Sequence, residues 1–240
     1  MNIIEKINKK KDMYNERPVT IAFLGDSVTQ GCFECFPTSE KSLDTVFDYK
    51  SAYSTRIKEI LNILYPKVQI NIINSGISGD SAVNGYERLE RDVLCFSPDL
   101  CVVSFGLNDS TFGDKGIEKY KNALSNIFSK LSENSIETIF LTQNTMCTKE
   151  SYHLTQPILI ESANRLSKIQ NSKILNKYFE QAKSVCEEYN VKICDMYSVW
   201  EKMENSGVET TELLANKLNH PIREFHYYIA IKLIETMFEI

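Results

Sequence analysis

Apolar residues along this chain follow two patterns, of which the first is a set of short continuous runs. Five such runs are rich in β-branched residues and are each closed by a glycine or by polar residues. Unbroken apolar runs of this length are typical of strands that are buried on both faces of a parallel sheet. The runs predict strands at residues 19–24, 68–73, 99–105, 138–142 and 191–194.

The second pattern lies between these runs, where apolar residues recur every three or four positions. This is the period of an amphipathic helix whose apolar stripe packs on a core. The pattern predicts helices at residues 51–65, 82–95, 117–131, 174–189 and 221–238. The last helix would begin at Pro221, because the first helical turn tolerates a proline.

The alternation of strand and helix predicts the fold class. Five repeats indicate an α/β chain with a doubly wound, flavodoxin-like parallel five-stranded sheet, right-handed crossovers and helices on both faces. We expect one domain over residues 1–240, with an N-terminal extension at 1–17. Insertions at 33–50 and 144–173 follow the first and fourth strands, and we expect them to form pocket walls or a lid.

Composition and charge exclude several classes of partner. The formal net charge is −5, which gives no basic surface for nucleic acid. No stretch approaches the roughly 20 apolar residues that span a bilayer, and the N-terminus lacks the apolar core of a secretory signal. We therefore expect a cytoplasmic protein with no nucleic-acid partner and no membrane span.

The cysteines indicate neither disulfides nor a metal site. There are seven of them, an odd number scattered over the chain, which is typical of reduced thiols. Cys32 and Cys35 form a single CxxC motif without the second pair or nearby histidines that a zinc site requires. We read them as two free thiols and expect neither metal nor cofactor.

Four short motifs stand just after strands one, two and three and before the last helix. They are GDSVTQG at 25–31, NSGISGDSA at 74–82, FGLND at 105–109 and NHP at 219–221. Each motif alone is equally typical of a turn, a flexible loop or a helix cap. Ligands bind where the carboxyl ends of parallel strands meet, so the order of the motifs brings a serine, a glycine, an asparagine and a histidine to one edge.

The chain has three histidines, and their positions separate them. His226 lies within the apolar stripe of the last predicted helix, so core or helix-face packing is expected. His153 lies in the long insertion and is a weaker candidate for catalysis. His220 stands at the mouth of the last helix, at the edge where the serine is expected, and is the candidate base.

Together the four motifs resemble those of the SGNH hydrolases, also called GDSL esterases and lipases, over about residues 19–230. The resemblance implies that Ser27 is the nucleophile and His220 its general base. It further implies that the N–H groups of Ser27 and Gly79 and the side chain of Asn108 form an oxyanion hole.

The implied activity is a serine ester hydrolase that works through an acyl-Ser27 intermediate. A hydroxyl needs an adjacent base to become a nucleophile, and placed donors stabilise the tetrahedral intermediate. The expected reaction removes a short acyl group such as acetyl from a sugar or other small alcohol. The partner would be a small-molecule or glycan ester, and Asp26 would brace the loop.

One position departs from the family pattern. Most members have an aspartate three residues before the histidine, and this chain has Lys217. A backbone carbonyl, or the amide oxygen of Asn216 or Asn219, could orient the imidazole instead. A carboxylate from elsewhere, such as Asp195 or Glu212, is a second explanation, and a loss of much of the activity is a third.

Two other functions stay open. Lys217 in place of aspartate motivates a catalytically weak protein that binds a carbohydrate or a protein partner. A flavin or nucleotide binder also fits the strand pattern, but residues 25–31 are neither a P-loop nor GxGxxG, and Asp26 would repel phosphate. A homo-oligomer is left open, because the stripe of the last helix suits either the sheet or a second subunit.

Overall fold

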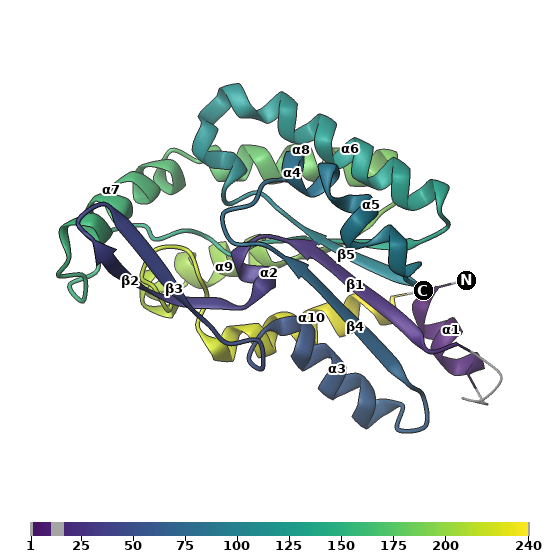
Figure 1. Cartoon of the computed structure of the whole chain (residues 1–240). Coiled ribbons are helices and arrows are strands. Elements are labelled where there is room, and N and C mark those ends of the chain that lie inside the picture. The colour runs from purple at the N-terminus through teal and green to yellow at the C-terminus, as the bar shows by residue number, and fades with distance from the viewer. Residues whose placement is uncertain (1, 11–16, 240) are drawn as a thin grey trace.

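A five-stranded parallel sheet forms the centre of the molecule (Figure 1). A computed structural model describes residues 2–10 and 17–239 of the chain. The strand order is β4-β1-β5-β6-β7. This confirms the predicted sheet, whose strands are β1 (Val19–Gly25), β4 (Ile70–Gly76), β5 (Leu100–Ser104), β6 (Glu137–Thr142) and β7 (Lys192–Asp195).

Burial differs between the central and the outer strands. All residues of β1 and β5 are buried, as their continuous apolar runs predict. The outer strands β4 and β7 are mostly half-buried, because each has a neighbour on one side only. The second run, which includes Asn71, and the fifth run therefore form edge strands and not strands buried on both faces.

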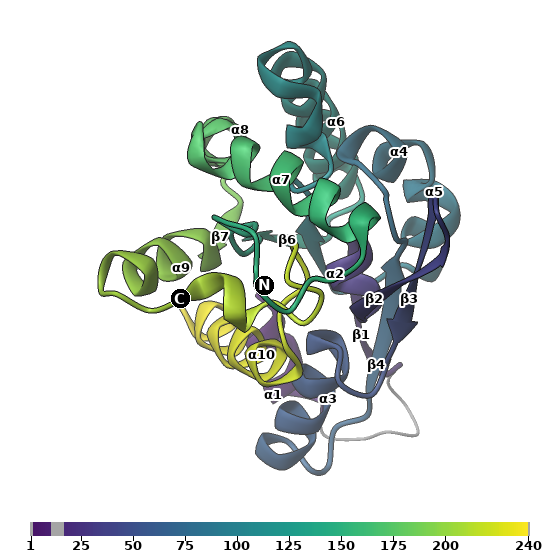
Figure 2. The same ribbon diagram turned by 90° about the vertical axis from the view of Figure 1, so that its left-hand side faces the viewer.

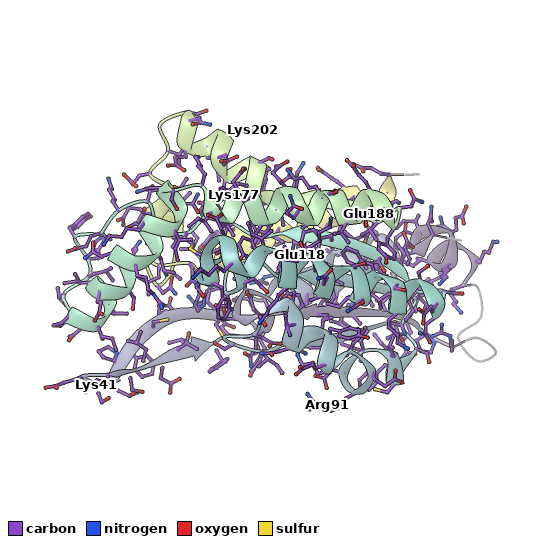
Figure 3. The ribbon with its side chains drawn as sticks, turned by 90° about the horizontal axis from the view of Figure 1, so that it is seen from above. Lys41, Arg91, Glu118, Lys177, Glu188 and Lys202 are labelled. Atoms are coloured by element: carbon purple, nitrogen blue, oxygen red, sulfur yellow. The ribbon has the colours of Figure 1, made fainter. Side chains whose placement is uncertain are left out.

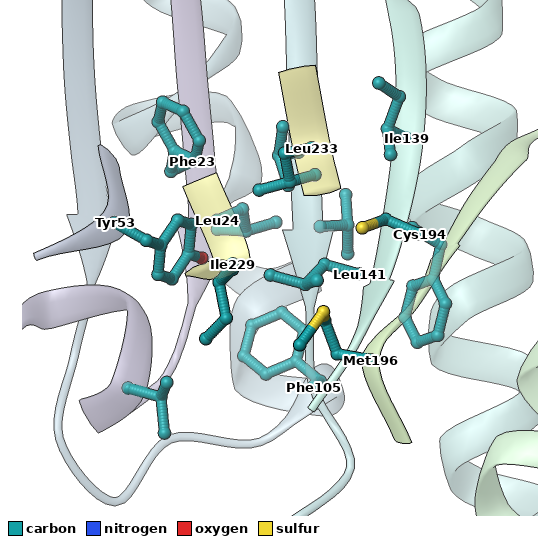
Figure 4. Packing of buried hydrophobic residues seen from close by; sticks show 14 of the residues in the cluster. Phe23, Leu24, Tyr53, Phe105, Ile139, Leu141, Cys194, Met196, Ile229 and Leu233 are labelled. Carbon is teal, nitrogen blue, oxygen red and sulfur yellow. The ribbon is translucent and has the colours of Figure 1, made fainter. Parts of the chain in front are cut away.

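Helices cover both faces of the sheet. In Figure 1, α6 (Ile117–Glu133) and α8 (Ile174–Glu188) lie on one face, and α3 (Tyr53–Leu64) and α10 (Arg223–Phe238) lie on the other. Figure 4 shows Ile229 and Leu233 of α10 among the apolar side chains of the strands. The buried stripe of α10 thus packs within the core of its own chain.

The predicted helix at 82–95 is wrong, because the segment is broken into three. It forms α4 (Ala82–Glu87), α5 (Leu89–Asp92) and the short 3₁₀ helix η1 (Leu94–Phe96). The first break lies at Arg88, whose backbone leaves the helical region at φ −99° and ψ 2°. The guanidinium of Arg88 points inward to polar partners instead of outward to water, and this requirement competes with a regular helix.

The last helix begins at Arg223 and not at Pro221 as predicted. Pro221 forms an antiparallel bridge with Leu214, and the N–H of Ile222 donates to the carbonyl of Leu213. These backbone bonds keep the chain extended for two more residues and delay the helix.

Each predicted insertion contains regular structure. Residues 33–50 include the antiparallel hairpin of β2 (Cys32–Ser39) and β3 (Ser42–Phe47), and residues 144–173 include α7 (Pro157–Asn171). The hairpin and α7 lie at the same end of the sheet (Figure 1), and Figure 2 views the molecule from that end. Residues 37–40 and 156–158 line one cavity between them, so the two insertions approach each other.

Five further helices were not predicted. They are α1 (Ile3–Lys9), α2 (Ser27–Gln30), α9 (Met196–Asn205) and the 3₁₀ helices η2 (Asp109–Gly116) and η3 (Thr210–Leu213). Helix α1 falls in the predicted N-terminal extension, of which residues 1 and 11–16 lie outside the described part. It buries Ile3, Ile4 and Ile7 and lies against α10. Within the described residues, every helix is too short or too polar to cross a membrane.

Candidate active site

Ser27 lies where β1 ends and α2 begins, and only 4% of it is exposed. Asp26 caps this short helix, since its Oδ1 accepts the N–H of Val28 at 3.0 Å. Ser27 is the first residue of α2, so its N–H has no intrahelical acceptor. The turn thus fixes the serine at the edge of the sheet with a backbone donor beside it.

His220 reaches Ser27 from the segment before α10. Its Nε2 lies 2.9 Å from Ser27 Oγ, and its Nδ1 lies 2.9 Å from the carbonyl oxygen of Phe33. A carbonyl oxygen can only accept, so the proton of the neutral ring stands on Nδ1. Nε2 is then free to accept the serine proton, which is the tautomer that a general base requires.

The environment of His220 keeps its ring neutral. Burial lowers its pKa to about 4, although the Phe33 carbonyl and the charge of Glu34 oppose the shift. Loss of water around the buried ring disfavours its charged form, and the two hydrogen-bond partners of the ring, the Phe33 carbonyl and Ser27 Oγ, carry no negative charge. At neutral pH the imidazole is therefore an acceptor and not a cation.

The loop that carries His220 is held by an asparagine. Asn216 Oδ1 accepts the backbone N–H groups of Leu218, Asn219 and His220 at 2.9–3.0 Å. Asn216 Nδ2 donates to Asn219 Oδ1 at 3.0 Å. The two amide oxygens that could have oriented the imidazole are thus engaged within the loop.

The two carboxylates suggested as replacements for the missing aspartate have other partners. Asp195 accepts Ser198 Oγ at 2.6 Å and pairs with Lys183 at 2.9 Å. Glu212 pairs with Lys217 at 3.0 Å. Lys217 itself has a left-handed backbone, with φ 58°, and its side chain extends to Glu212. The imidazole of His220 is bonded to Phe33 and Ser27 and to neither of these carboxylates.

Gly79 and Asn108 lie together on the wall of a cavity of about 620 Å³. Gly79 has φ +79°, a conformation that favours glycine, and a side chain there would meet open space. Asn108 Nδ2 donates to the carbonyl of Asp80 at 2.9 Å and lies 3.4 Å from Asp26 Oδ2. The second contact is long, so the N–H that faces Asp26 is the more weakly held of the two.

Gln143 is a site residue that the motifs did not reveal. Its Nε2 lies 2.9 Å from both carboxylate oxygens of Asp26, and its Oε1 accepts the N–H of Leu107 at 2.9 Å. Burial raises the pKa of Asp26 to about 7. The one sequence signal that could have identified Gln143 as a site residue is its position directly after the fourth predicted strand. Its bonds agree with a bracing position for Asp26.

Arg88 is the second residue that sequence reasoning missed. Its guanidinium donates to the carbonyls of Gly25 at 2.9 Å and Ser75 at 2.7 Å. It also pairs with Asp80 at 2.7 Å. Arg88 therefore ties the ends of β1 and β4 to the loop that carries Gly79. An arginine between helical segments normally indicates solvent exposure, so no pattern pointed to it.

The other two histidines lie apart from Ser27. His226 is fully buried and its Nδ1 accepts the N–H of Tyr53 at 3.2 Å, which confirms the prediction of core packing. His153 is exposed, and its Nε2 lies 3.5 Å from Glu212. Cys32 and Cys35 are both free thiols, as predicted.

A family comparison covers nearly the whole chain. Residues 23–226 match the model of the GDSL-like Lipase/Acylhydrolase family. An acetylxylan esterase of Geobacillus stearothermophilus is 32% identical over 89 residues, which are 37% of this chain and 39% of that esterase. The sequence match thus spans about two fifths of the length of this relative.

Solved structures share the fold. A catalytic mutant of an acetylxylan esterase from Geobacillus stearothermophilus has a TM-score of 0.67 at 18% identity, with 92% of this chain and 94% of that chain covered. A two-domain esterase active on acetylated mannans has a TM-score of 0.63 at 20% identity, with 92% and 48% covered. Catalytic mutants of the first enzyme include a serine and an aspartate replaced by alanine.

Proposed function

Because this chain belongs to the GDSL-like lipase/acylhydrolase family, we propose that it is a carboxylic ester hydrolase with Ser27 and His220 as its catalytic dyad. One observation carries this proposal. His220 Nε2 lies 2.9 Å from Ser27 Oγ while the opposite ring nitrogen is bound to a carbonyl oxygen. This arrangement selects the tautomer that removes a proton from serine.

The proposed reaction has two halves. His220 Nε2 takes the hydroxyl proton as Ser27 Oγ bonds to the ester carbonyl carbon, and the carbonyl oxygen becomes an oxyanion. In this proposal that oxygen accepts from the N–H groups of Ser27 and Gly79 and from Asn108 Nδ2. The intermediate then expels the alcohol, which takes the proton from His220. Water repeats the sequence on acyl-Ser27 and releases the acid.

Phe33 takes over one of the two tasks of the missing aspartate. Its carbonyl fixes the ring and the tautomer, but it supplies a dipole where the family supplies a negative charge. In a serine protease triad, a neutral partner that selects the wrong tautomer costs about 10⁴ in turnover. Here the tautomer is the productive one, so we infer a smaller loss and a working enzyme.

The proposed substrate is a short acyl ester, such as an acetyl ester, of a sugar or other small alcohol. The names of the similar proteins support this choice, since they describe esterases of acetylated xylan and acetylated mannan. The cavity beside Gly79 has the size of a typical small-ligand site. Phe112 lies on its wall with 70% of its surface exposed, and it offers a flat face to a sugar ring.

The test is hydrolysis of 4-nitrophenyl acetate at neutral pH, together with labelling of the protein by a fluorophosphonate. We expect turnover by the wild type, background rates for Ser27→Ala and His220→Gln, and a label on Ser27. His153→Gln is the matched control and should keep the wild-type rate. Wild-type turnover at background with no label on Ser27 would refute the esterase. Binding of xylo-oligosaccharides would then favour the weak carbohydrate-binding protein.

A further inference from the structure

The cavity beside Gly79 and Asn108 has a cationic wall. Lys115 of η2, Lys119 of α6 and Arg165 of α7 all line it. Two of these residues are close in sequence, whereas Arg165 comes from the second insertion. The chain as a whole is acidic, with a net charge of −5, so this concentration of positive charge runs against its composition.

These three cations lack internal counterions. In the part of the chain that the structure describes, none of them lies within 4.0 Å of a carboxylate oxygen. The nearby carboxylate of Asp114 is engaged elsewhere, because it pairs with Lys177 at 2.7 Å, and Glu118 lies 3.4 Å from the amide of Asn122. Lys177 and Glu118 are labelled in Figure 3. The positive charge of the wall is therefore available to a ligand.

One carboxyl group occurs among the described residues that line the cavity. Asp109 is 4% exposed, and its Oδ1 accepts the N–H of Ala82 at 3.0 Å. Burial raises the pKa of Asp109 to about 7, so much of its negative charge is withheld at neutral pH. Its Oδ2 is buried with no hydrogen-bond partner. This carboxyl group therefore does little to neutralise the cations.

We propose that the cationic wall binds an anionic group on the alcohol part of the substrate, so that the enzyme prefers short acyl esters of acidic sugars. The proposal rests on the function proposed above. If the carbonyl group of the ester lies at Gly79 and Asn108, a short acyl chain occupies little of the cavity. Most of the 620 Å³ is then left for the alcohol part of the substrate. Arg165 can bind a carboxylate or a phosphate through two parallel bonds, and the lysines add charge.

The first measurement compares matched substrates with the wild type. They are methyl xyloside acetate, which is neutral, methyl glucuronoside acetate, which adds a carboxylate to the same ring, and acetylated glucose 6-phosphate. We expect a KM about tenfold lower for an anionic sugar, because charged hydrogen bonds are stronger than neutral ones. The difference should shrink in 0.5 M salt, since exposed charges are screened. A preference for the carboxylate or for the phosphate identifies the source of the anion.

The second measurement uses the triple variant Lys115→Gln, Lys119→Gln, Arg165→Gln. It should lose the preference for anionic sugars while its rate on 4-nitrophenyl acetate stays the same. Lys177→Gln is the matched control, since Lys177 is an exposed neighbour already paired with Asp114 and it should change nothing. Thermal unfolding verifies that the variants are folded. If the triple variant does not fold, the salt dependence of the wild-type KM still tests the proposal, because it needs no variant.

The outcomes separate this proposal from the esterase itself. Equal KM values for neutral and anionic sugars, in an enzyme that hydrolyses 4-nitrophenyl acetate, would overturn the anionic site alone. Titration calorimetry of methyl glucuronoside and of glucose 6-phosphate with Ser27→Ala needs no turnover. Binding heat that is seen with Ser27→Ala and is lost when the three cationic residues are also replaced would support the anionic site, even if the protein proves not to be an esterase. No heat with either ligand would contradict the site.

Discussion

The two halves of the site are held in different ways. On the serine side, a buried ion pair positions the loops, since Arg88 joins Asp80 to the ends of two strands, while Gln143 bonds the carboxyl group of Asp26. On the histidine side, the ring is bonded to Ser27 Oγ and to the Phe33 carbonyl, and the amides of Asn216 and Asn144 bond the backbone of its loop. An ion pair ties the serine side together, whereas the hydrogen-bond partners of the His220 ring are neutral.

This difference separates two tasks that a catalytic aspartate normally combines. One task is to orient the imidazole and select its tautomer, and the Phe33 carbonyl does this at 2.9 Å. The other is to stabilise the imidazolium that forms during attack, which requires negative charge. The low pKa of His220 shows how little the surroundings favour that cation. We therefore expect the oxyanion side to supply most of the catalytic stabilisation.

The largest expected effect is on that side. Asn108→Ala should lower kcat by about 100- to 1000-fold with little change in KM, because it removes a donor that we propose acts in the transition state. Steady-state kinetics with 4-nitrophenyl acetate measures it. Asn84 lines the same cavity, so Asn84→Ala is the matched control, and we expect it to leave kcat unchanged. A large rise in KM at constant kcat would instead assign Asn108 to ground-state binding.

The next effect is on the histidine side. Asn216→Ala removes the acceptor of three backbone N–H groups, so we expect a loss of about 2–3 kcal/mol of stability and a roughly tenfold lower kcat. Thermal unfolding and kinetics measure the two losses. Asn216→Asp keeps an acceptor oxygen and should recover most of both, whereas Asn219→Ala should cost less. Full activity in Asn216→Ala would show that the loop needs no such support.

The smallest expected effect is at the position that departs from the family. Lys217→Asp should change kcat/KM by no more than about threefold, because Nδ1 of His220 already donates to Phe33 and residue 217 points to Glu212. Lys217→Gln, which only removes the charge, is the control, and kcat/KM for 4-nitrophenyl acetate is the readout. A gain of 100-fold or more in Lys217→Asp would mean that the third place of a triad was vacant.

The fold was largely predictable because its signals are local. Continuous apolar runs located the five strands, and 3.6-residue stripes located four of the five helices closely. The failures have tertiary causes. Arg88 breaks the helix predicted at 82–95 through bonds to two strand ends, and the bridge at Pro221 delays the last helix. The hairpin of β2 and β3 carries no stripe that separates it from a loop.

Candidate site residues could be proposed from sequence where residue type limits the chemistry. Motif order predicts that Ser27, Gly79, Asn108 and His220 meet at one edge of a parallel sheet, and their roles, which the family resemblance implies, stay predictions. The orienting group of His220 could not be chosen from sequence, because every residue has a backbone carbonyl. Phe33 lies 187 positions away, and only the folded hairpin brings it to the ring. Partners recognised by backbone atoms leave no trace in residue type.

The most direct test of the account is the protonation state of His220, followed by ¹⁵N NMR of histidine-labelled protein during a pH titration. Three histidines give three ring systems, and His153→Gln and His226→Gln assign two of them. We predict that His220 carries its proton on Nδ1 and stays neutral from pH 8 until the pH approaches its pKa of about 4. A proton on Nε2, or a charged ring already at pH 6, would contradict a dyad oriented by the Phe33 carbonyl.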